Sequence, residues 1–301
     1  MIPLAIAFTP NYFVQAATLL RSVLDACPEG DFRVICLLTE ELPDRMKEKL
    51  QRLGAGRLSL EYLPLKGRLQ GAYIDPRYSE AASLRLLLPE LLPELDRILY
   101  LDCDIIVRQD LTKLWKETDL GDNYLGVVFE APIEGQTERF RALGCDPDRY
   151  FNSGFLLMNL AQMRAENVSE KLLDACRVPY LEFPDQDALN QVCQGRVLPL
   201  SPLYNSIRTF FIPKYKPAFI RQYGEGLWER VQQEATVHYT GGKPWNLFTV
   251  QFGTWWRVYD TLPDEIQEEW TPGRMYRFWR CYRTPLGRPI DAVRTIKQKL
   301  G

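Results

Sequence analysis

The amino-acid sequence predicts an α/β fold with a mostly parallel sheet flanked by helices. Short apolar runs typical of buried strands alternate along the chain with segments of helical periodicity. The apolar runs show little alternation with polar residues, which is typical of parallel strands covered by helices on both faces. A chain of 301 residues can form one large α/β domain, or one domain with an appendage.

The N-terminal third alternates between strand and helix patterns. Apolar runs predict strands at residues 4–8, 31–38 and 58–63, and periodic segments predict helices at residues 14–26 and 42–53. Residues 66–77 have weak periodicity and predict a loop. Residues 79–88 predict a helix that stops at Pro89, because proline disrupts a helix interior.

The later segments continue the pattern with shorter elements. The apolar run at 97–107 predicts a buried strand, and further strands are expected at 124–129 and from residue 155 to residue 160. Helices are expected after the cap residue Asp110, at 134–143, at 168–176, and after Asp185 as an N-cap. Residues 204–216 are rich in aromatic residues and proline and predict irregular structure.

The overall composition excludes several classes of protein. A formal net charge of −2 gives no reason to expect a nucleic-acid partner. Seven scattered cysteines without a Cys-x-x-Cys pair argue against a zinc site and fit reduced thiols in a cytoplasmic protein. The chain has no apolar run near the ~20 residues that a membrane span requires, and its start lacks a signal-peptide pattern.

Two carboxylates, Asp102 and Asp104, interrupt the apolar run at 97–107. Ionised carboxylates are costly inside a sheet, so we expect them at the carboxyl end of the strand, where open α/β sheets bind ligands. In an extended segment, the side chains of Asp102 and Asp104 point the same way and can bind a hard divalent cation. The alternative is a turn that happens to contain two aspartates.

Three further polar groups interrupt predicted elements. Asn152 and Ser153, with Gly154, precede an apolar strand, and a glycine at this place allows close approach of a ligand. Arg85 lies on a predicted helix, as a surface charge or as a cation that meets a phosphate. Asp185, Gln186 and Asp187 crowd one helical turn, although an aspartate at a helix start is usually only a cap.

His238 is the only histidine in the chain, and Gly241, Gly242 and Lys243 follow it closely. A glycine pair beside a lysine can form an anion-binding nest. A neutral imidazole near two carboxylates would complete a mixed nitrogen and oxygen site suited to Mn²⁺, with Mg²⁺ less favoured. The alternative is a structural histidine.

The end of the chain is basic and aromatic. Residues 272–301 contain eight Lys or Arg residues against one Asp, with aromatic residues between them. Such segments bind anionic membrane surfaces at about 1 kcal/mol per basic residue. The alternatives are a basic helix packed on its own domain and a disordered tail. Because of this change in composition, we divide the chain into a main domain, 1–260, and a C-terminal segment, 261–301. We expect the C-terminal segment to contact the inner face of the cell membrane peripherally.

Residues 2–245 resemble glycosyltransferase family 8, the retaining enzymes that include bacterial lipopolysaccharide glucosyl- and galactosyltransferases and the glycogenins. The resemblance rests on motifs that occur in the family's order: Asn11-Tyr12, Arg85, Leu99-Tyr100-Leu101-Asp102-Cys103-Asp104, Phe151-Asn152-Ser153-Gly154, Asp185-Gln186-Asp187-Ala188-Leu189-Asn190, and His238-Tyr239-Thr240-Gly241 with Lys243-Pro244-Trp245. One departure is Thr9-Pro10, where many members carry an aspartate.

The resemblance implies a GT-A fold with a Rossmann-like sheet, a UDP-glucose or UDP-galactose donor, and a Mn²⁺ ion. Asp102, Asp104 and His238 would then hold the metal. The implied donor-binding residues are Phe8, Thr9, Asn11 and Tyr12 at the uridine, Gly241 and Lys243 at the phosphates, Arg85 at the donor sugar or diphosphate, Asn152 and Ser153 at the sugar, and Cys103.

The implied reaction is transfer of a hexose to a glycan or glycolipid with retention of anomeric configuration. Gln186 is a poor nucleophile, so we expect same-face attack, with Asp185 orienting the sugar and Glu130 touching the acceptor. One alternative is a non-catalytic protein that binds nucleotide sugars or glycans. The other is a Mg²⁺-dependent phosphohydrolase of the haloacid-dehalogenase type, which the apolar residues at 105–107 disfavour because that family continues with a small polar loop.

Overall fold

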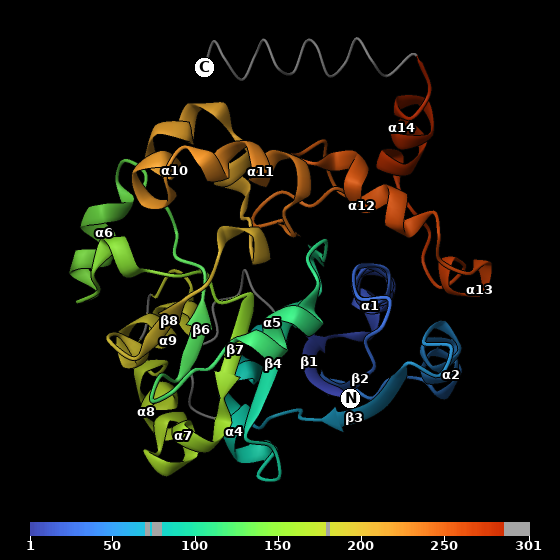
Figure 1. Ribbon diagram of the computed structural model, residues 1–301. Helices are drawn as coiled ribbons and strands as arrows, with labels where there is room; N and C mark the ends of the chain where they lie inside the picture. The colour runs from blue at the N-terminus through green and yellow to red at the C-terminus, as the bar shows by residue number, and fades with distance from the viewer. Residues whose placement is uncertain (70–72, 74–79, 179–180, 286–301) are drawn as a thin grey trace.

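The computed structural model describes residues 1–69, 73, 80–178 and 181–285, and its centre is a seven-stranded sheet (Figure 1). The strand order is β3-β2-β1-β4-β7-β6-β8. Strands β1, β2, β3 and β4 are parallel, whereas β7 is antiparallel to β4 and β6, and β8 is parallel to β6. The strands are β1 (Ile2–Phe8), β2 (Phe32–Leu38), β3 (Leu58–Pro64), β4 (Arg97–Asp102), β6 (Leu125–Val127), β7 (Phe155–Asn159) and β8 (Val197–Pro199). The predicted α/β class is confirmed.

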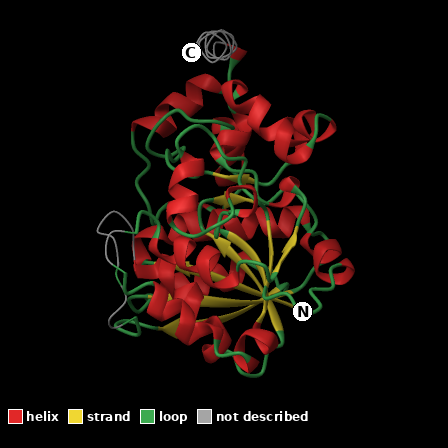
Figure 2. Ribbon diagram, turned by 90° about the vertical axis from the view of Figure 1, so that its left-hand side faces the viewer, coloured by secondary structure: helices red, strands yellow, loops and turns green. Residues whose placement is uncertain are grey.

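Helices cover both faces of the sheet (Figure 2). One face packs against α1 (Phe13–Ala26), α2 (Asp44–Leu53) and α5 (Leu111–Glu117). The opposite face packs against α3 (Glu80–Ser83), η2 (Leu84–Leu87), α4 (Leu88–Leu91), α7 (Leu160–Ala165), α8 (Val168–Ala175) and α9 (Pro184–Cys193). The remaining elements before the C-terminal helices are η1 (Pro10–Tyr12), α6 (Gln136–Ala142), η3 (Pro147–Arg149), η4 (Pro202–Tyr204), η5 (Arg208–Phe211) and η6 (Pro213–Tyr215).

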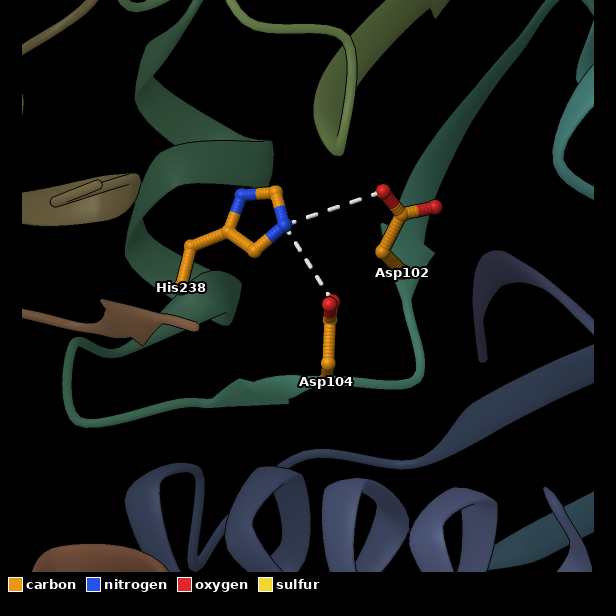
Figure 3. A group of neighbouring side chains, drawn as sticks. All are labelled: Asp102, Asp104 and His238. Carbon is orange, nitrogen blue, oxygen red and sulfur yellow. Dashed lines mark ion pairs between the residues drawn. The ribbon is translucent and has the colours of Figure 1, made fainter. Parts of the chain in front are cut away.

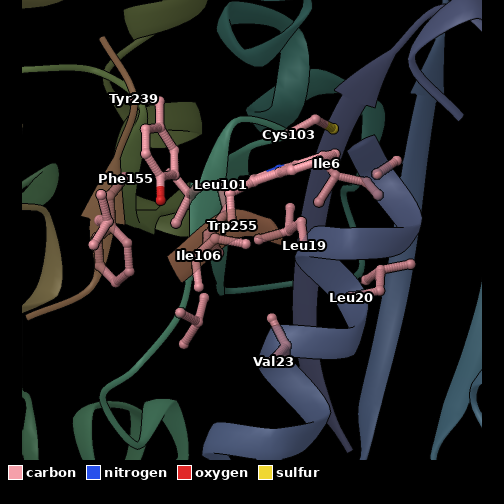
Figure 4. Close-up of a cluster of buried hydrophobic side chains, with 14 of the residues drawn as sticks. Ile6, Leu19, Leu20, Val23, Leu101, Cys103, Ile106, Phe155, Tyr239 and Trp255 are labelled. Atoms are coloured by element: carbon pink, nitrogen blue, oxygen red, sulfur yellow. The ribbon is translucent and has the colours of Figure 1, made fainter. Parts of the chain in front are cut away.

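Strand β4 contributes to the hydrophobic core on both faces. Leu99 and Leu101 lie in the cluster with α1, whereas Ile98 and Tyr100 lie in the cluster on the opposite face. This division follows from the two-residue period of a strand. Figure 4 shows Leu101 beside Ile6 of β1 and the apolar side chains of α1. Burial on both faces explains why the run contains no charged residue between Ile98 and Asp102.

A group of C-terminal helices lies at the top of Figure 1, with α13 lower, at the right near α2. Its members are α10 (Lys216–Tyr223), α11 (Gly226–Glu234), α12 (Phe252–Tyr259), α13 (Asp264–Gln267) and α14 (Arg274–Tyr282). The ring of Phe278 on α14 lies 5.6 Å from that of Phe252 on α12, and the indole of Trp279 donates to Asp260 at 2.8 Å. Arg52 of α2 is ion-paired with Glu265 of α13 at 2.8 Å. Residues 261–285 therefore pack on the main domain, and the division at residue 260 stays a prediction.

Three local predictions are wrong. Pro89 does not end a helix but lies in the first turn of α4, where a missing N–H costs nothing. Asp185 is not the N-cap of α9, because Phe183 has that position and Pro184 begins the helix. Cys103 and Asp104 form a turn after β4, and the apolar run then resumes as a separate strand, β5 (Ile105–Ile106).

Two predictions fall partly outside the described residues. The predicted loop at 66–77 includes residues 70–72 and 74–77, and the basic tail includes residues 286–301. Residue 79, where the helix before Pro89 was expected to begin, also lies outside. Among the residues that the structure describes, no helix has the length and apolar character that crossing a bilayer demands.

Candidate active site at the carboxyl ends of β1 and β4

A cleft of about 910 Å³ opens where β1 and β4 end. Ala7 pairs with Asp102 in this part of the sheet. The chain runs from β1 to β2 and β3 on one side, and then returns to β4 on the other side. Open α/β sheets bind ligands at such a reversal of strand order, and the volume is in the usual range for small-molecule sites. The cleft is therefore the candidate functional site.

Asp102, Asp104 and His238 meet at the edge of this cleft (Figure 3). Strand β5 pairs with β9 (Val237–His238), and this pairing places His238 opposite Ile105. Nε2 of His238 lies 3.2 Å from Oδ1 of Asp104 and 3.8 Å from Oδ2 of Asp102. One ligand atom from each residue lies within 4.8 Å of the other two. The three side chains therefore converge on one point.

The donor set and its surroundings fit a divalent cation. Oδ1 of Asp104 is buried, and it accepts no hydrogen bond within the described part of the chain. Gly154 leaves room beside the ligands, because a Cβ there would lie 2.6 Å from Oδ2 of Asp102 and would collide with the His238 ring. One imidazole nitrogen and two carboxylates suit Mn²⁺.

Basic side chains flank both carboxylates. Lys243 donates to Oδ2 of Asp104 and to the carbonyl of Tyr239. Burial favours the neutral form of Asp104, but the ammonium of Lys243 outweighs it and holds the pKa of this carboxyl below its ordinary value. Arg85 is buried, and its guanidinium lies 2.9 Å from Asp102 and 3.2 Å from Asp185. The cleft thus holds fixed positive charge beside the acidic cluster.

The opposite wall of the cleft is built around Gln186 on α9. Its Oε1 accepts from Nδ2 of Asn152 at 2.9 Å and from the backbone N–H of Ser153 at 3.1 Å. Its Nε2 donates toward Glu130 at 3.3 Å and toward the Tyr150 hydroxyl at 3.2 Å. Burial raises the pKa of Glu130 to about 7. Gln186 therefore connects Asn152 and Ser153 to the buried carboxyl group of Glu130 through hydrogen bonds.

The family model described as "Glycosyl transferase family 8" matches residues 3–248 of the chain. The chain belongs to glycosyltransferase family 8. The confirmed resemblance agrees with the cleft, in which the motifs of the family come together. They come from η1, η2, β4 and the turn after it, the residues before β7, α9, and β9 with the segment that follows it.

Individual relatives and a solved structure support the same assignment. General stress protein A of Bacillus subtilis is 29% identical over 67% of this chain and 71% of its own length. Lipopolysaccharide 1,2-glucosyltransferase of Escherichia coli is 27% identical over 76% of this chain and 64% of its own length. The galactosyltransferase LgtC, in complex with donor and acceptor sugar analogues, matches with a TM-score of 0.72 and 25% identity over 89% of this chain and 100% of that one. The family 8 chain therefore has the GT-A fold.

The structure brings most of the predicted site residues to the cleft. The predicted residues that line it are Phe8, Thr9, Tyr12, Arg85, Asp102, Cys103, Asp104, Glu130, Asn152, Ser153, Asp185, Gln186, His238, Gly241 and Lys243. Asn11 does not line it and is exposed on η1. The individual roles of these residues stay predictions.

Sequence reasoning missed the ionic cluster around Asp187, the residue after Gln186, and the buried side-chain amide of Asn205. Asp187 is fully buried, and Arg139 of α6 holds both of its oxygens at 2.8 and 2.7 Å. Tyr150 donates to the same carboxylate at 2.5 Å. Asn205 contacts His238 from a stretch that the sequence indicated only as irregular. A polar pair, Asn205-Ser206, between aromatic and apolar residues was the available signal.

Proposed function

We propose that this family 8 member is a retaining hexosyltransferase that moves glucose or galactose from a UDP-sugar to a glycan or glycolipid acceptor. The names of its relatives support glucose and galactose as donor sugars and lipopolysaccharide as the acceptor class. The single observation that carries the proposal is the convergence of Asp102, Asp104 and His238 beside Lys243 in the cleft.

Departure of UDP requires stabilisation of negative charge on the diphosphate. A Mn²⁺ ion held by Asp102, Asp104 and His238 would neutralise that charge when bound, and Mg²⁺ is the alternative metal. Lys243 would leave Asp104 and turn its ammonium toward the phosphates, helped by the backbone of Gly241. Arg85 and Lys243 are buried or partly buried, and such cations stabilise developing charge more strongly than they would in bulk water.

The nucleotide and the sugar would occupy different walls of the cleft. Thr9, Tyr12 and the backbone around Phe8 and Cys103 offer a surface for the uridine at the end of β1. At the sugar, Asp185 accepts from Ser153 at 3.3 Å and is ion-paired with Arg85, so its orientation is defined. Burial raises the pKa of Asp185, and Arg85 opposes that effect.

The carboxylates of α9 favour same-face attack over a covalent intermediate. Asp187 is held by Arg139 and Tyr150, and Asp185 is paired with Arg85. The side chain between them, Gln186, is an amide and a poor nucleophile. A covalent route needs a carboxylate placed to attack the anomeric carbon. We infer that the leaving phosphate accepts the proton of the acceptor hydroxyl.

The acceptor would enter on the side of Glu130, where Gln136, Arg139 and Phe183 also line the cleft. Outside the cleft, the C-terminal segment would contact an anionic membrane surface on the cytoplasmic side. Its arginines on α14 are exposed, while Trp279 is buried in the core, so the contact would be electrostatic.

The test is release of UDP from a panel of UDP-sugars by the purified full chain, with and without Mn²⁺ or Mg²⁺. We expect metal-dependent release from UDP-glucose or UDP-galactose that increases when a lipopolysaccharide core acceptor is added. A rate of UDP release that is the same with and without divalent metals would contradict the metal-assisted mechanism. Metal-dependent UDP binding, measured by thermal shift, without turnover on any acceptor would favour a non-catalytic sugar-binding role.

A further inference from the structure

We propose that Asn205 is a positioning residue that holds the imidazole of His238 in the tautomer with hydrogen on Nδ1. The lone pair of Nε2 then faces Asp102 and Asp104. The inference deepens the proposed function, because it rests on the same metal site. It follows from a chain of buried hydrogen bonds whose directions are fixed by two backbone N–H groups.

The first fixed point is the side-chain amide of Asn152. Its Oδ1 accepts from the backbone N–H of Gly154 at 3.1 Å. Its Nδ2 lies 2.9 Å from Oε1 of Gln186, which also accepts from the backbone N–H of Ser153 at 3.1 Å. A backbone N–H can only donate, so both atoms that receive these bonds are oxygens. The orientation of the Asn152 amide is therefore determined at both ends.

The orientation of the Asn152 amide in turn determines the orientation of the Asn205 amide. The Asn205 side chain lies between Oδ1 of Asn152, at 3.1 Å, and Nδ1 of His238, at 3.0 Å. Because Oδ1 of Asn152 accepts, Asn205 presents its NH₂ group there and its oxygen to the imidazole. An amide oxygen can only accept, so Nδ1 of His238 carries the hydrogen. Asn205 is fully buried and His238 is 3% exposed, so water does not compete for these positions.

The consequence is electrostatic. An unprotonated Nε2 faces Oδ1 of Asp104 at 3.2 Å and Oδ2 of Asp102 at 3.8 Å, so three acceptors converge. Their mutual repulsion is relieved by a cation. With the other tautomer, Nε2 would donate to Asp104 and close the site with an ordinary hydrogen bond. Asn205 thus decides whether His238 acts as a ligand or as a hydrogen-bond donor.

The test begins with ¹⁵N NMR of the full chain without metal, since the single histidine requires no assignment among several. We expect two-bond ¹H–¹⁵N correlations of the wild-type imidazole to show a protonated Nδ1 and an unprotonated Nε2. A wild-type spectrum with hydrogen on Nε2 would overturn the proposal. This outcome does not depend on whether the protein turns over a sugar donor.

The variants then connect the tautomer to metal affinity. Asn205→Leu removes the acceptor at similar size, and we expect exchange between tautomers and about 10- to 100-fold weaker binding of Mn²⁺, measured by electron paramagnetic resonance of free Mn²⁺. Asn205→Asp restores an oxygen, and we expect it to keep the Nδ1–H tautomer and to bind Mn²⁺ more tightly than Asn205→Leu. Ser206→Ala, which removes a neighbouring buried hydroxyl bonded to Pro202, is the matched control with unchanged tautomer and affinity.

The outcomes separate the inference from the proposed function. A folded Asn205→Leu protein that binds Mn²⁺ as tightly as the wild type would overturn the positioning role. If Asn205→Leu does not fold, the wild-type spectrum and Asn205→Asp still decide the question. Absence of Mn²⁺ binding by the wild type, together with the Nδ1–H tautomer, would contradict the proposed metal site and leave the hydrogen-bond assignment intact.

Discussion

Nε2 of His238 lies 3.2 Å from Oδ1 of Asp104, although the two residues come from distant parts of the chain. The pairing of β5 with β9 brings the two side chains together, although each of those strands has only two residues. The backbone N–H of Tyr239 also donates to the carbonyl of Asp104 at 3.1 Å. The geometry of the candidate metal site is therefore set by backbone bonds on both sides of the cluster.

Replacing His238 by alanine should weaken Mn²⁺-dependent binding of UDP while the fold is retained. The strand pairing of His238 uses its backbone, so loss of the imidazole leaves β9 in place. We expect a loss of more than about 100-fold in Mn²⁺-dependent affinity, beyond the usual effect of removing only a supporting residue. Isothermal titration of UDP with and without Mn²⁺ measures it. Unchanged affinity would mean that His238 is structural.

Replacing Gly154 by alanine should fill the space that the cation requires. The new Cβ would collide with the His238 ring and lie 2.6 Å from Oδ2 of Asp102. Forced overpacking of this kind costs about 1–3 kcal/mol of unfolding free energy. Urea unfolding and Mn²⁺ titration should both change. Gly226→Ala is the control, because a Cβ there meets nothing within 4 Å among the described residues.

The sequence predicted the sheet and the pair of aspartates well because both depend on local patterns. The buried run of β4, with Asp102 at its end and Asp104 just after it, required only strand periodicity and the cost of burying charge. Asn205 stands in a visible polar pair, but its role could not be found this way, because that role depends on contacts with Asn152 and His238 that chain topology creates. Asp185 was misassigned as a cap because propensity cannot tell a capping carboxylate from one that pairs with a distant arginine.

Removing Arg139 should destabilise the protein strongly, because Asp187 would be left as a buried carboxylate without its cation. Breaking one partner of a buried ion pair costs about 3–5 kcal/mol. We expect such a decrease in the unfolding free energy of Arg139→Ala in urea, and a smaller decrease for Arg139→Ala combined with Asp187→Asn. Arg141→Ala, an exposed position on the same helix, should change little. Equal stability of Arg139→Ala and Arg141→Ala would show that Asp187 does not need the pair.

Charge reversal on α14 should reduce binding to anionic vesicles. Arg277 and Arg280 are exposed, and each basic residue near the lipid contributes about 1 kcal/mol. We expect Arg277→Glu with Arg280→Glu to weaken cosedimentation with phosphatidylglycerol vesicles by about tenfold or more, without loss of UDP release from soluble donor. Lys113→Glu with Lys116→Glu on α5 makes the same change in net charge and should not weaken binding. Equal effects of the two pairs would indicate net charge rather than the C-terminal segment.

Glu130 should make the stability of the protein depend on pH. Burial raises its pKa to about 7 in the folded chain, against an ordinary value of 4.5. Between these values the folded state binds more protons than the unfolded state, so the unfolding free energy decreases as pH rises from about 4.5 to about 7. One pKa unit corresponds to about 1.4 kcal/mol, so this residue contributes a decrease of about 3 kcal/mol at most.

Glu130→Gln provides the test, because its amide keeps a hydrogen-bonding group beside Gln186 without the cost of a buried charge. We expect the variant to be more stable than the wild type in urea at pH 8 and to lose that advantage at pH 5, where Glu130 is protonated in the folded state. Other titrating groups are common to both proteins, so the difference between the two curves isolates Glu130. A difference in unfolding free energy that is constant with pH would show that Glu130 ionises with its ordinary pKa in the folded chain.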